Sequence, residues 1–280
     1  MKKTSFFLLV LTVLLTLASC NQKEKKLAKI VDGITAEQLD AIREITAEAF
    51  GMDADSIDFG YGFSNDTLYF VGYDNHCYEG YDFNLRKEFI LAALCSDASE
   101  TKGLLSQISE VPAALEFFFV DTIGHSLYNP TVSNAEIKGA LSKNYTSRDA
   151  LSSYVNFVKD KQDITLENDY VVLSVNKNGL FNGIEETVQQ DIDDAKNSFL
   201  ANIDDIVDIN LYKDKISESY IKNFQNNAKE TIVEIGLFED VGYFGKLMKN
   251  NDVGFIVRFK DSDKNIDIVW EPDELKQLIK

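Results

Sequence analysis

The feature that most constrains the fold is a pattern that occurs twice in the chain. An Asn-Asp pair leads directly into a strand-like segment in FSNDTLYFVGY, residues 63–73, and again in LENDYVVLSVN, residues 166–176. In the first copy the segments on either side of Ser-Asn-Asp alternate in the manner of strands, which predicts two strands joined by a tight turn. The repetition suggests that the chain starts the same fold twice.

A second correspondence links the ends of the two copies. Residues 253–279, VGFIVRFKDSDKNIDIVWEPDELKQLI, align without gaps with residues 115–141, LEFFFVDTIGHSLYNPTVSNAEIKGAL, and Glu274 coincides with Glu136. Both stretches read as an apolar strand, a polar turn, a second strand and a capped helix. Their identity is low, so coincidence between common patterns is the alternative explanation. We favour an α+β fold made of two related small α/β-sandwich-like units, each with a helix, antiparallel strands and a helix.

The two predicted units differ in their middle parts. The first unit is expected over residues 34–144 and the second over 145–280, with a helical insertion at about 184–235. Within it, apolar residues recur every three to four positions, whereas acidic residues occupy the other face; the apolar residues are Ile184, Val188, Ile192, Ala195, Phe199, Ile203 and Ile206. Ordinary amphipathic packing explains this spacing. The alternative is a partner site in which the helix lies in a groove.

The amino-terminal residues have the pattern of a targeting segment. Lys2 and Lys3 precede an apolar run over residues 5–19, which is shorter than the roughly 20 residues that a membrane-spanning helix needs. The run ends in Leu-Ala-Ser-Cys at residues 17–20. This tetrapeptide resembles the lipobox of bacterial lipoprotein precursors. An ordinary secretory signal followed by a chance cysteine is the alternative.

The lipobox resemblance implies a particular processing route. In that family the signal is cleaved before the cysteine, the thiol is joined to diacylglycerol, and the new amino terminus is usually acylated. For this chain it implies a signal peptide over residues 1–19, a lipid on Cys20 and a lipidated tether over 20–33. The lipid on Cys20 would make the membrane a partner, because several buried acyl chains hold a protein there essentially permanently.

The residues after the cysteine indicate where in the cell envelope the protein is located. Asn21 is not the aspartate that retains many lipoproteins of enteric bacteria at the inner membrane, so the resemblance implies the outer membrane. In the Bacteroidota an acidic run after the cysteine resembles a surface-export signal, whereas NQKEKK, residues 21–26, holds three lysines and one glutamate. We therefore expect a lipid-anchored protein that faces the periplasm.

The charge of the chain excludes one class of partner. Without Lys2 and Lys3 the chain has 26 Lys and Arg against 46 Asp and Glu, a net charge of about −20. Such a charge repels the phosphates of nucleic acids, so we expect no nucleic-acid partner. With 45% hydrophobic residues, the chain is nevertheless apolar enough to fold.

No motif in the sequence nominates a catalytic, cofactor-binding or metal-ligating residue. The chain lacks a Gly-x-Ser-x-Gly elbow, a His-Glu-x-x-His pair and a glycine-rich phosphate loop. The segment 261–267, DSDKNID, has the acidic spacing of a calcium loop, but Ile266 replaces the required glycine, so a β-hairpin turn is the better interpretation. We expect a non-enzymatic binding or assembly subunit that works with an envelope protein. An envelope hydrolase with spatially assembled carboxylates is the alternative.

An aromatic-rich stretch is the candidate ligand surface. Residues 61–83 contain eight aromatic residues among aspartates and asparagines. Aromatic rings beside acids and amides are typical of sugar-binding sites, which makes a glycan the possible ligand. The expected surface consists of Tyr61, Tyr69, Tyr73, Tyr78 and Tyr81. The alternative is that these residues simply form good strands with polar tips.

The two remaining cysteines form a candidate disulfide. Once Cys20 carries lipid, Cys77 and Cys95 are an even pair in a compartment that oxidises thiols. A bridge between them would close a short loop and contribute on the order of 3 kcal/mol. The alternative is a free Cys95 buried in an apolar helix.

Overall fold

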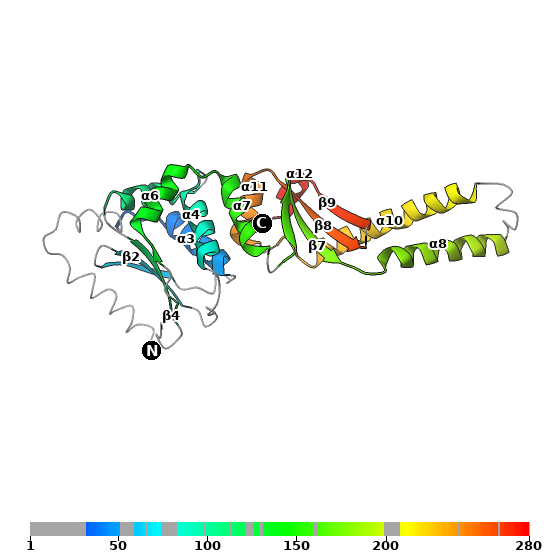
Figure 1. Ribbon diagram of the computed structural model, residues 1–280, viewed down its shortest axis with the longest axis horizontal. Helices are drawn as coiled ribbons and strands as arrows, with labels where there is room; N and C mark the ends of the chain where they lie inside the picture. The colour runs from blue at the N-terminus through cyan, green and yellow to red at the C-terminus, as the bar shows by residue number, and fades with distance from the viewer. Residues whose placement is uncertain are drawn as a thin grey trace. The chain divides into compact units, whose positions relative to one another are not determined.

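The structure, a computed structural model, shows an α+β fold as predicted (Figure 1). It describes residues 32–50, 59–64, 67–73, 83–97, 99–111, 114–120, 126–128, 131–159, 162–198, 208–239, 241–262 and 264–279. The chain divides into two compact units. The first comprises Met1–Phe157 with Gly242–Asn251, and the second comprises Val158–Val241 with Asp252–Lys280.

The first unit combines a small mixed sheet with helices. Its elements are α3 (Ala36–Phe50), β1 (Phe59–Ser64), β2 (Thr67–Tyr73), α4 (Phe83–Cys95), α5 (Lys102–Ser109), β3 (Ala114–Val120), β4 (Ser126–Tyr128), β5 (Thr131–Val132), α6 (Asn134–Lys143), α7 (Ser147–Val158) and α11 (Gly242–Asn250). Strand β1 pairs antiparallel with β2, β2 pairs parallel with β3, and β3 pairs antiparallel with β4 and β5. The parallel pair requires a long connection, which α4 and α5 supply.

The second unit repeats this sheet topology. Its elements are β6 (Ile164–Glu167), β7 (Tyr170–Asn176), α8 (Leu180–Asn197), α10 (Ile209–Glu234), β8 (Gly254–Asp261), β9 (Lys264–Trp270) and α12 (Pro272–Leu278). The strand order β6-β7-β8-β9 again runs antiparallel, parallel and antiparallel. The two Asn-Asp turns are closed by equivalent pairs, Ser64 with Thr67 and Glu167 with Tyr170. This shared topology agrees with the predicted duplication.

The two units also share an ion pair at equivalent positions. Lys87 Nζ of α4 lies 2.6 Å from Glu136 Oε1, and Lys229 Nζ of α10 lies 2.8 Å from Glu274 Oε2. Each glutamate is the third residue of the helix that follows the last hairpin. Glu136 and Glu274 are the residues that the ungapped sequence alignment superimposes. A matching contact between distant segments is harder to explain by coincidence than a matching pattern.

The ion pair in the first unit predicts a dependence of stability on pH. Hydrogen bonds from Lys87 and Ser133 lower the pKa of Glu136 from 4.5 to about 2. A lowered pKa adds stability above pH 4.5, and this stability is lost as the pH falls from about 4.5 towards 2. Because the side chain is 35% exposed, we expect a loss of only about 1 kcal/mol. Urea unfolding at pH 7 and pH 3 should show this loss of free energy of unfolding in the wild type. The loss should be smaller in Glu136→Gln, which cannot ionise at this position. An equal loss in the wild type and the variant would contradict the role of Glu136.

The first compact unit holds two helices more than the predicted boundary between residues 144 and 145 gives it. Helices α7 and α11, both expected in the second unit, belong to the first. The reason is a cluster of aromatic rings: Tyr154 of α7 stacks on Phe244 of α11 at 4.4 Å, and Phe89 of α4 lies 5.4 Å from Tyr154. Ring contacts of this kind add to the burial of apolar area. Packing thus groups these helices with α4.

The helical insertion of the second unit is confirmed as α8 and α10. The two helices run side by side (Figure 1), and α8 buries Val188 and Ile192, whereas α10 buries no side chain completely. Beyond the contact with α8, α10 lies along the sheet edge, where Gln225 Nε2 donates to the Asp267 carbonyl at 3.0 Å. Phe199, Ile203 and Ile206 of the predicted apolar face lie outside the described residues.

The segment with calcium-loop spacing forms the hairpin between β8 and β9, as interpreted from the sequence. Asp261 pairs with Lys264 across the strands. The Asp261 carboxylate accepts a hydrogen bond from the Phe181 backbone N–H at 3.0 Å, and the Asp267 carboxylate accepts two from Arg258 at 2.9 and 3.0 Å. Asp263 lies outside the described residues. These carboxylates therefore hold the hairpin and the start of α8.

Candidate functional site

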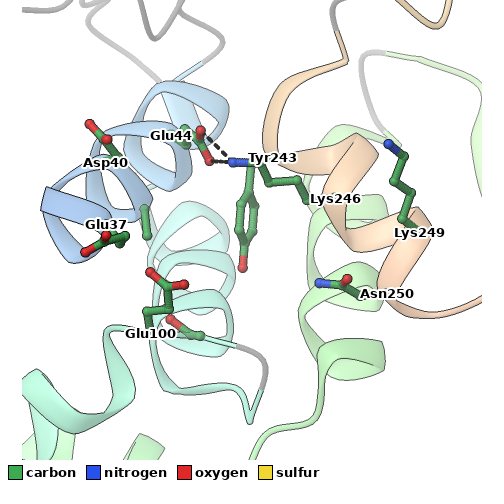
Figure 2. A pocket seen from close by; sticks show the side chains of 10 residues that line it. Glu37, Asp40, Glu44, Glu100, Tyr243, Lys246, Lys249 and Asn250 are labelled. Carbon is green, nitrogen blue, oxygen red and sulfur yellow. Dashed lines mark hydrogen bonds and ion pairs between the residues drawn. The ribbon is translucent and has the colours of Figure 1, made fainter. Parts of the chain in front are cut away.

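A pocket of about 440 Å³ in the first unit is the candidate site (Figure 2). Helix α3 contributes Glu37, Asp40, Ala41 and Glu44, and the segment before α5 contributes Ser99 and Glu100. Helix α11 contributes Tyr243, Lys246, Lys249 and Asn250. The pocket therefore has an acidic side from α3 and a basic side from α11.

The acidic side follows from the amphipathic pattern of α3. A capping box starts the helix, since the Gln38 backbone N–H donates to Thr35 Oγ1 at 3.2 Å and the Thr35 N–H donates to Gln38 Oε1 at 3.1 Å. Ile42, Ile45 and Ala49 are buried on one face. The acids three and four positions apart therefore share the opposite face and line the pocket together.

The basic side follows from the packing of α11. The helix buries Phe244, Leu247 and Met248. Lys246 and Lys249 are three positions apart, so they occupy neighbouring sites on one side of the helix. Gly242 starts the helix with φ at +53°, and a Cβ there would lie 3.0 Å from the Glu48 carboxylate. Glycine suits this position because it adopts the left-handed conformation without strain.

One ion pair joins the two sides of the pocket. Lys246 Nζ lies 2.5 and 2.7 Å from the two carboxylate oxygens of Glu44, as the dashed lines in Figure 2 show. Their side chains are 58% and 25% exposed, so the pair contributes little free energy. Its effect is geometric, because it joins α11 to α3 across the pocket and neutralises one acid and one lysine.

The other acids differ in their surroundings. Hydrogen bonds from its own backbone N–H and from Thr35 lower the pKa of Glu37. Asp40 lies 3.4 Å from Arg43, one turn further along the helix. Hydrolysis by a carboxylate pair needs one carboxyl group with a raised pKa as the general acid. The pKa of Glu37 is shifted in the opposite direction.

Tyr243 lies at the centre of the pocket (Figure 2). Its ring lies 6.3 Å from Phe89, which fixes it against the aromatic cluster. Burial, together with the nearby Glu44 charge, raises the pKa of its phenol above 10. The hydroxyl is therefore protonated at neutral pH and can donate a hydrogen bond.

The predicted aromatic surface is only partly within the described residues. Tyr61 lies in β1 opposite Phe70, and Tyr69 lies in β2 between Gly62 and Glu116. Tyr73 lies at the end of β2, next to Val120 of β3. Tyr69 has the only described side chain of the five and is half-buried, and Tyr78 and Tyr81 lie outside the described residues. The glycan surface stays a prediction.

Of the three cysteines, only Cys95 is among the described residues. Cys95 ends α4, is completely buried, and forms no disulfide with a described residue; burial raises the pKa of its thiol to about 12. Its proposed partner Cys77 and the lipid-site candidate Cys20 lie outside the described residues. Both the disulfide and the lipidation stay predictions.

The pocket was not predicted from the sequence. A signal existed in the acids at positions 37, 40 and 44, which have helical spacing, but solvated acidic faces are common on helices. Within the described ranges, no three His, Cys, Asp or Glu side chains are grouped as metal ligands, and no helix is long and apolar enough to cross a bilayer. Compared with protein-family models, with curated proteins and with solved structures, the chain shows no significant match to any of them.

Proposed function

We propose that the protein is a non-enzymatic binding subunit of a bacterial envelope, held at the outer membrane through lipid on Cys20 and facing the periplasm. The observation that carries the binding role is the pocket of about 440 Å³ with acids on α3 and lysines on α11. Pockets of this volume suit small molecules. The lipobox-like residues 17–20 support the address, and the absence of a catalytic motif from the sequence supports binding without turnover.

The lipid anchor at Cys20 is tested by lipid labelling. Wild-type protein grown with an alkyne fatty acid should carry the label and sediment with membranes, whereas Cys20→Ala should lose the label completely and move to the soluble fraction or stay as uncleaved precursor. Cys77→Ala is the matched control and should be labelled like the wild type. Full labelling of Cys20→Ala would contradict the anchor.

The binding role is tested by ligand screening. Purified protein without its signal and lipid is mixed with amino acids, short peptides and cell-wall glycans, and the midpoint of thermal unfolding is measured. A ligand that raises the midpoint and is recovered chemically unchanged supports a binding subunit, because binding to the folded state stabilises it. Conversion of a ligand into product would instead support the hydrolase, and no shift with any ligand would contradict the binding role.

A further inference from the structure

The sheet of the first unit has one buried and one more open face. Along β2 and β3 the exposure alternates: Leu68, Leu115 and Phe117 are at most 1% exposed, whereas Tyr69 and Glu116 are half-buried. This alternation arises because successive residues of a strand point to opposite faces. The register places one row of residues side by side across β1, β2, β3 and β5 on the open face, namely Gly62, Tyr69, Glu116 and Thr131. We call these residues the Tyr69 row.

The second unit has the same row with different chemistry. Tyr69 and Val172 are equivalent, because each lies two positions after the residue that closes its Asn-Asp hairpin. The row in the second sheet consists of Thr165, Val172, Ile256 and Val269. Its central positions are aliphatic, and Val172 is completely buried. Packing alone favours such residues in a strand. The phenol and the carboxylate of the first unit are therefore groups that this sheet topology does not need.

The Glu116 carboxylate lacks a counter-charge within the described part of the chain. It forms no hydrogen bond or ion pair with a described residue, and the Tyr69 row contains no cation. The second sheet differs in this respect, because Arg258 binds both Glu167 and Asp267 there. Taking a carboxylate out of water costs free energy unless donors or a cation compensate it. The row thus combines an unpaired negative charge with an aromatic ring.

We propose that the Tyr69 row binds an arginine side chain of a partner protein, independently of the pocket. Neighbouring strands lie about 4.8 Å apart, so Tyr69 and Glu116 are lateral neighbours on the open face. A guanidinium group is planar, stacks on an aromatic ring, and binds a carboxylate through its fork of N–H donors. Thr131, beside Glu116 in the row, supplies a hydroxyl that can accept from the same group.

Shape and charge identify a basic chain segment as the occupant. Gly62 lies in the edge strand β1 and has no side chain, which allows another backbone to approach the sheet closely beside Tyr69. Small molecules bind mainly in concave sites, whereas this row lies on the face of a sheet. The net charge of −18 attracts a basic segment and repels anionic lipid headgroups. Charge complementarity therefore favours a protein partner over a membrane surface.

The experiment titrates blocked peptides into the purified protein without its signal and lipid, by calorimetry at low salt. The probe is acetyl-Ala-Val-Arg-Val-Ala-amide, and two further peptides carry lysine or citrulline in place of arginine. Citrulline keeps the planar shape and loses the charge, so its peptide should bind about tenfold more weakly than the arginine peptide. The lysine peptide should lie between them, because an ammonium group cannot stack and fork in the same way.

Matched variants locate the binding on the Tyr69 row. Glu116→Gln removes the charge at nearly constant volume, so it should weaken the arginine peptide about fivefold and leave the citrulline peptide unchanged. Tyr69→Val introduces the residue of the equivalent row and should weaken the arginine peptide by a similar factor. Glu88→Gln makes the same change as Glu116→Gln at an exposed position of α4 and should change nothing. Circular dichroism checks that each variant is folded.

Three outcomes overturn the proposal. The first is an arginine peptide that binds no better than the citrulline peptide, or not at all. The second is arginine-peptide binding that Glu116→Gln leaves unchanged. The third is binding of Nα-acetyl-arginine amide as tight as that of the arginine peptide, which would indicate a small-molecule site. The ligand screen of the pocket is a separate measurement, so the proposed binding role can stand or fall without this surface.

Discussion

Replacing Arg86 by alanine is expected to lower the free energy of unfolding of the first unit by about 3–5 kcal/mol. Arg86 lies on α4 and is only 1% exposed. Its guanidinium donates to the Ala49 carbonyl in the last turn of α3 and lies 4.9 Å from the centre of the Phe157 ring. Carbonyls at a helix end have no partner within the helix and carry partial negative charge. The alanine variant would lose the hydrogen bond, the cation–π contact and the packing of the side chain.

A second variant separates packing from charge at this position. Arg86→Met keeps most of the apolar volume and loses the donor, so it should cost about 1–3 kcal/mol. Both values come from urea unfolding followed by circular dichroism. Emission from Trp270, the only tryptophan in the chain, reports on the second unit in the same samples. A cost below about 1 kcal/mol for Arg86→Ala would contradict the structural role of the buried guanidinium.

Replacing Trp270 by alanine is expected to cost the second unit about 3–5 kcal/mol. Trp270 ends β9 and has no exposed surface. Its ring lies 5.2 Å from the ring of Phe238 and 6.3 Å from that of Phe255, and the Lys229 ammonium lies 5.5 Å from it. Removing the indole would leave a cavity between the sheet and these residues, and urea unfolding followed by circular dichroism measures the loss.

The substitution Trp270→Phe is the control for Trp270→Ala, because it keeps an aromatic ring at this position. The Trp270 indole N–H is buried and has no hydrogen-bond partner among the described residues. Phenylalanine therefore removes no hydrogen bond and keeps most of the aromatic packing, so Trp270→Phe should cost less than about 1.5 kcal/mol. Equal losses for alanine and phenylalanine would show that packing of the ring is not what stabilises this part of the sheet.

Local patterns were sufficient to predict much of the fold. Strand alternation around Ser-Asn-Asp predicted a hairpin in the first copy, which Ser64 and Thr67 close, and the repeated Asn-Asp pair lies in an equivalent hairpin closed by Glu167 and Tyr170. The alignment of Glu136 with Glu274 pointed to equivalent helices, and the structure places a lysine beside each glutamate. The hairpins and the starts of these helices depend on residues close together in sequence, where turn chemistry and helix capping act directly.

The candidate site needed information that local patterns do not hold. Lys246 and Glu44 are separated by 202 residues, yet their charged groups lie 2.5 Å apart. The spacing of acids on α3 is visible in the sequence. However, a charged helix face has the same sequence pattern whether solvent or another helix lies opposite it. The same applies to α11, whose basic residues resemble an ordinary exposed face.

By itself the sequence determined the α+β class, the hairpins, the repeated unit and the helical insertion, because strand alternation, turn residues and helical spacing are local properties. Only the tertiary structure decided that α7 and α11 pack into the first unit, and hence that Lys246 of α11 pairs with Glu44 of α3. The physical reason is that stacking of Tyr154 on Phe244, and packing of Tyr154 against Phe89, depends on complementary shape between distant segments. Spacing along the chain does not encode which of many apolar faces fits another.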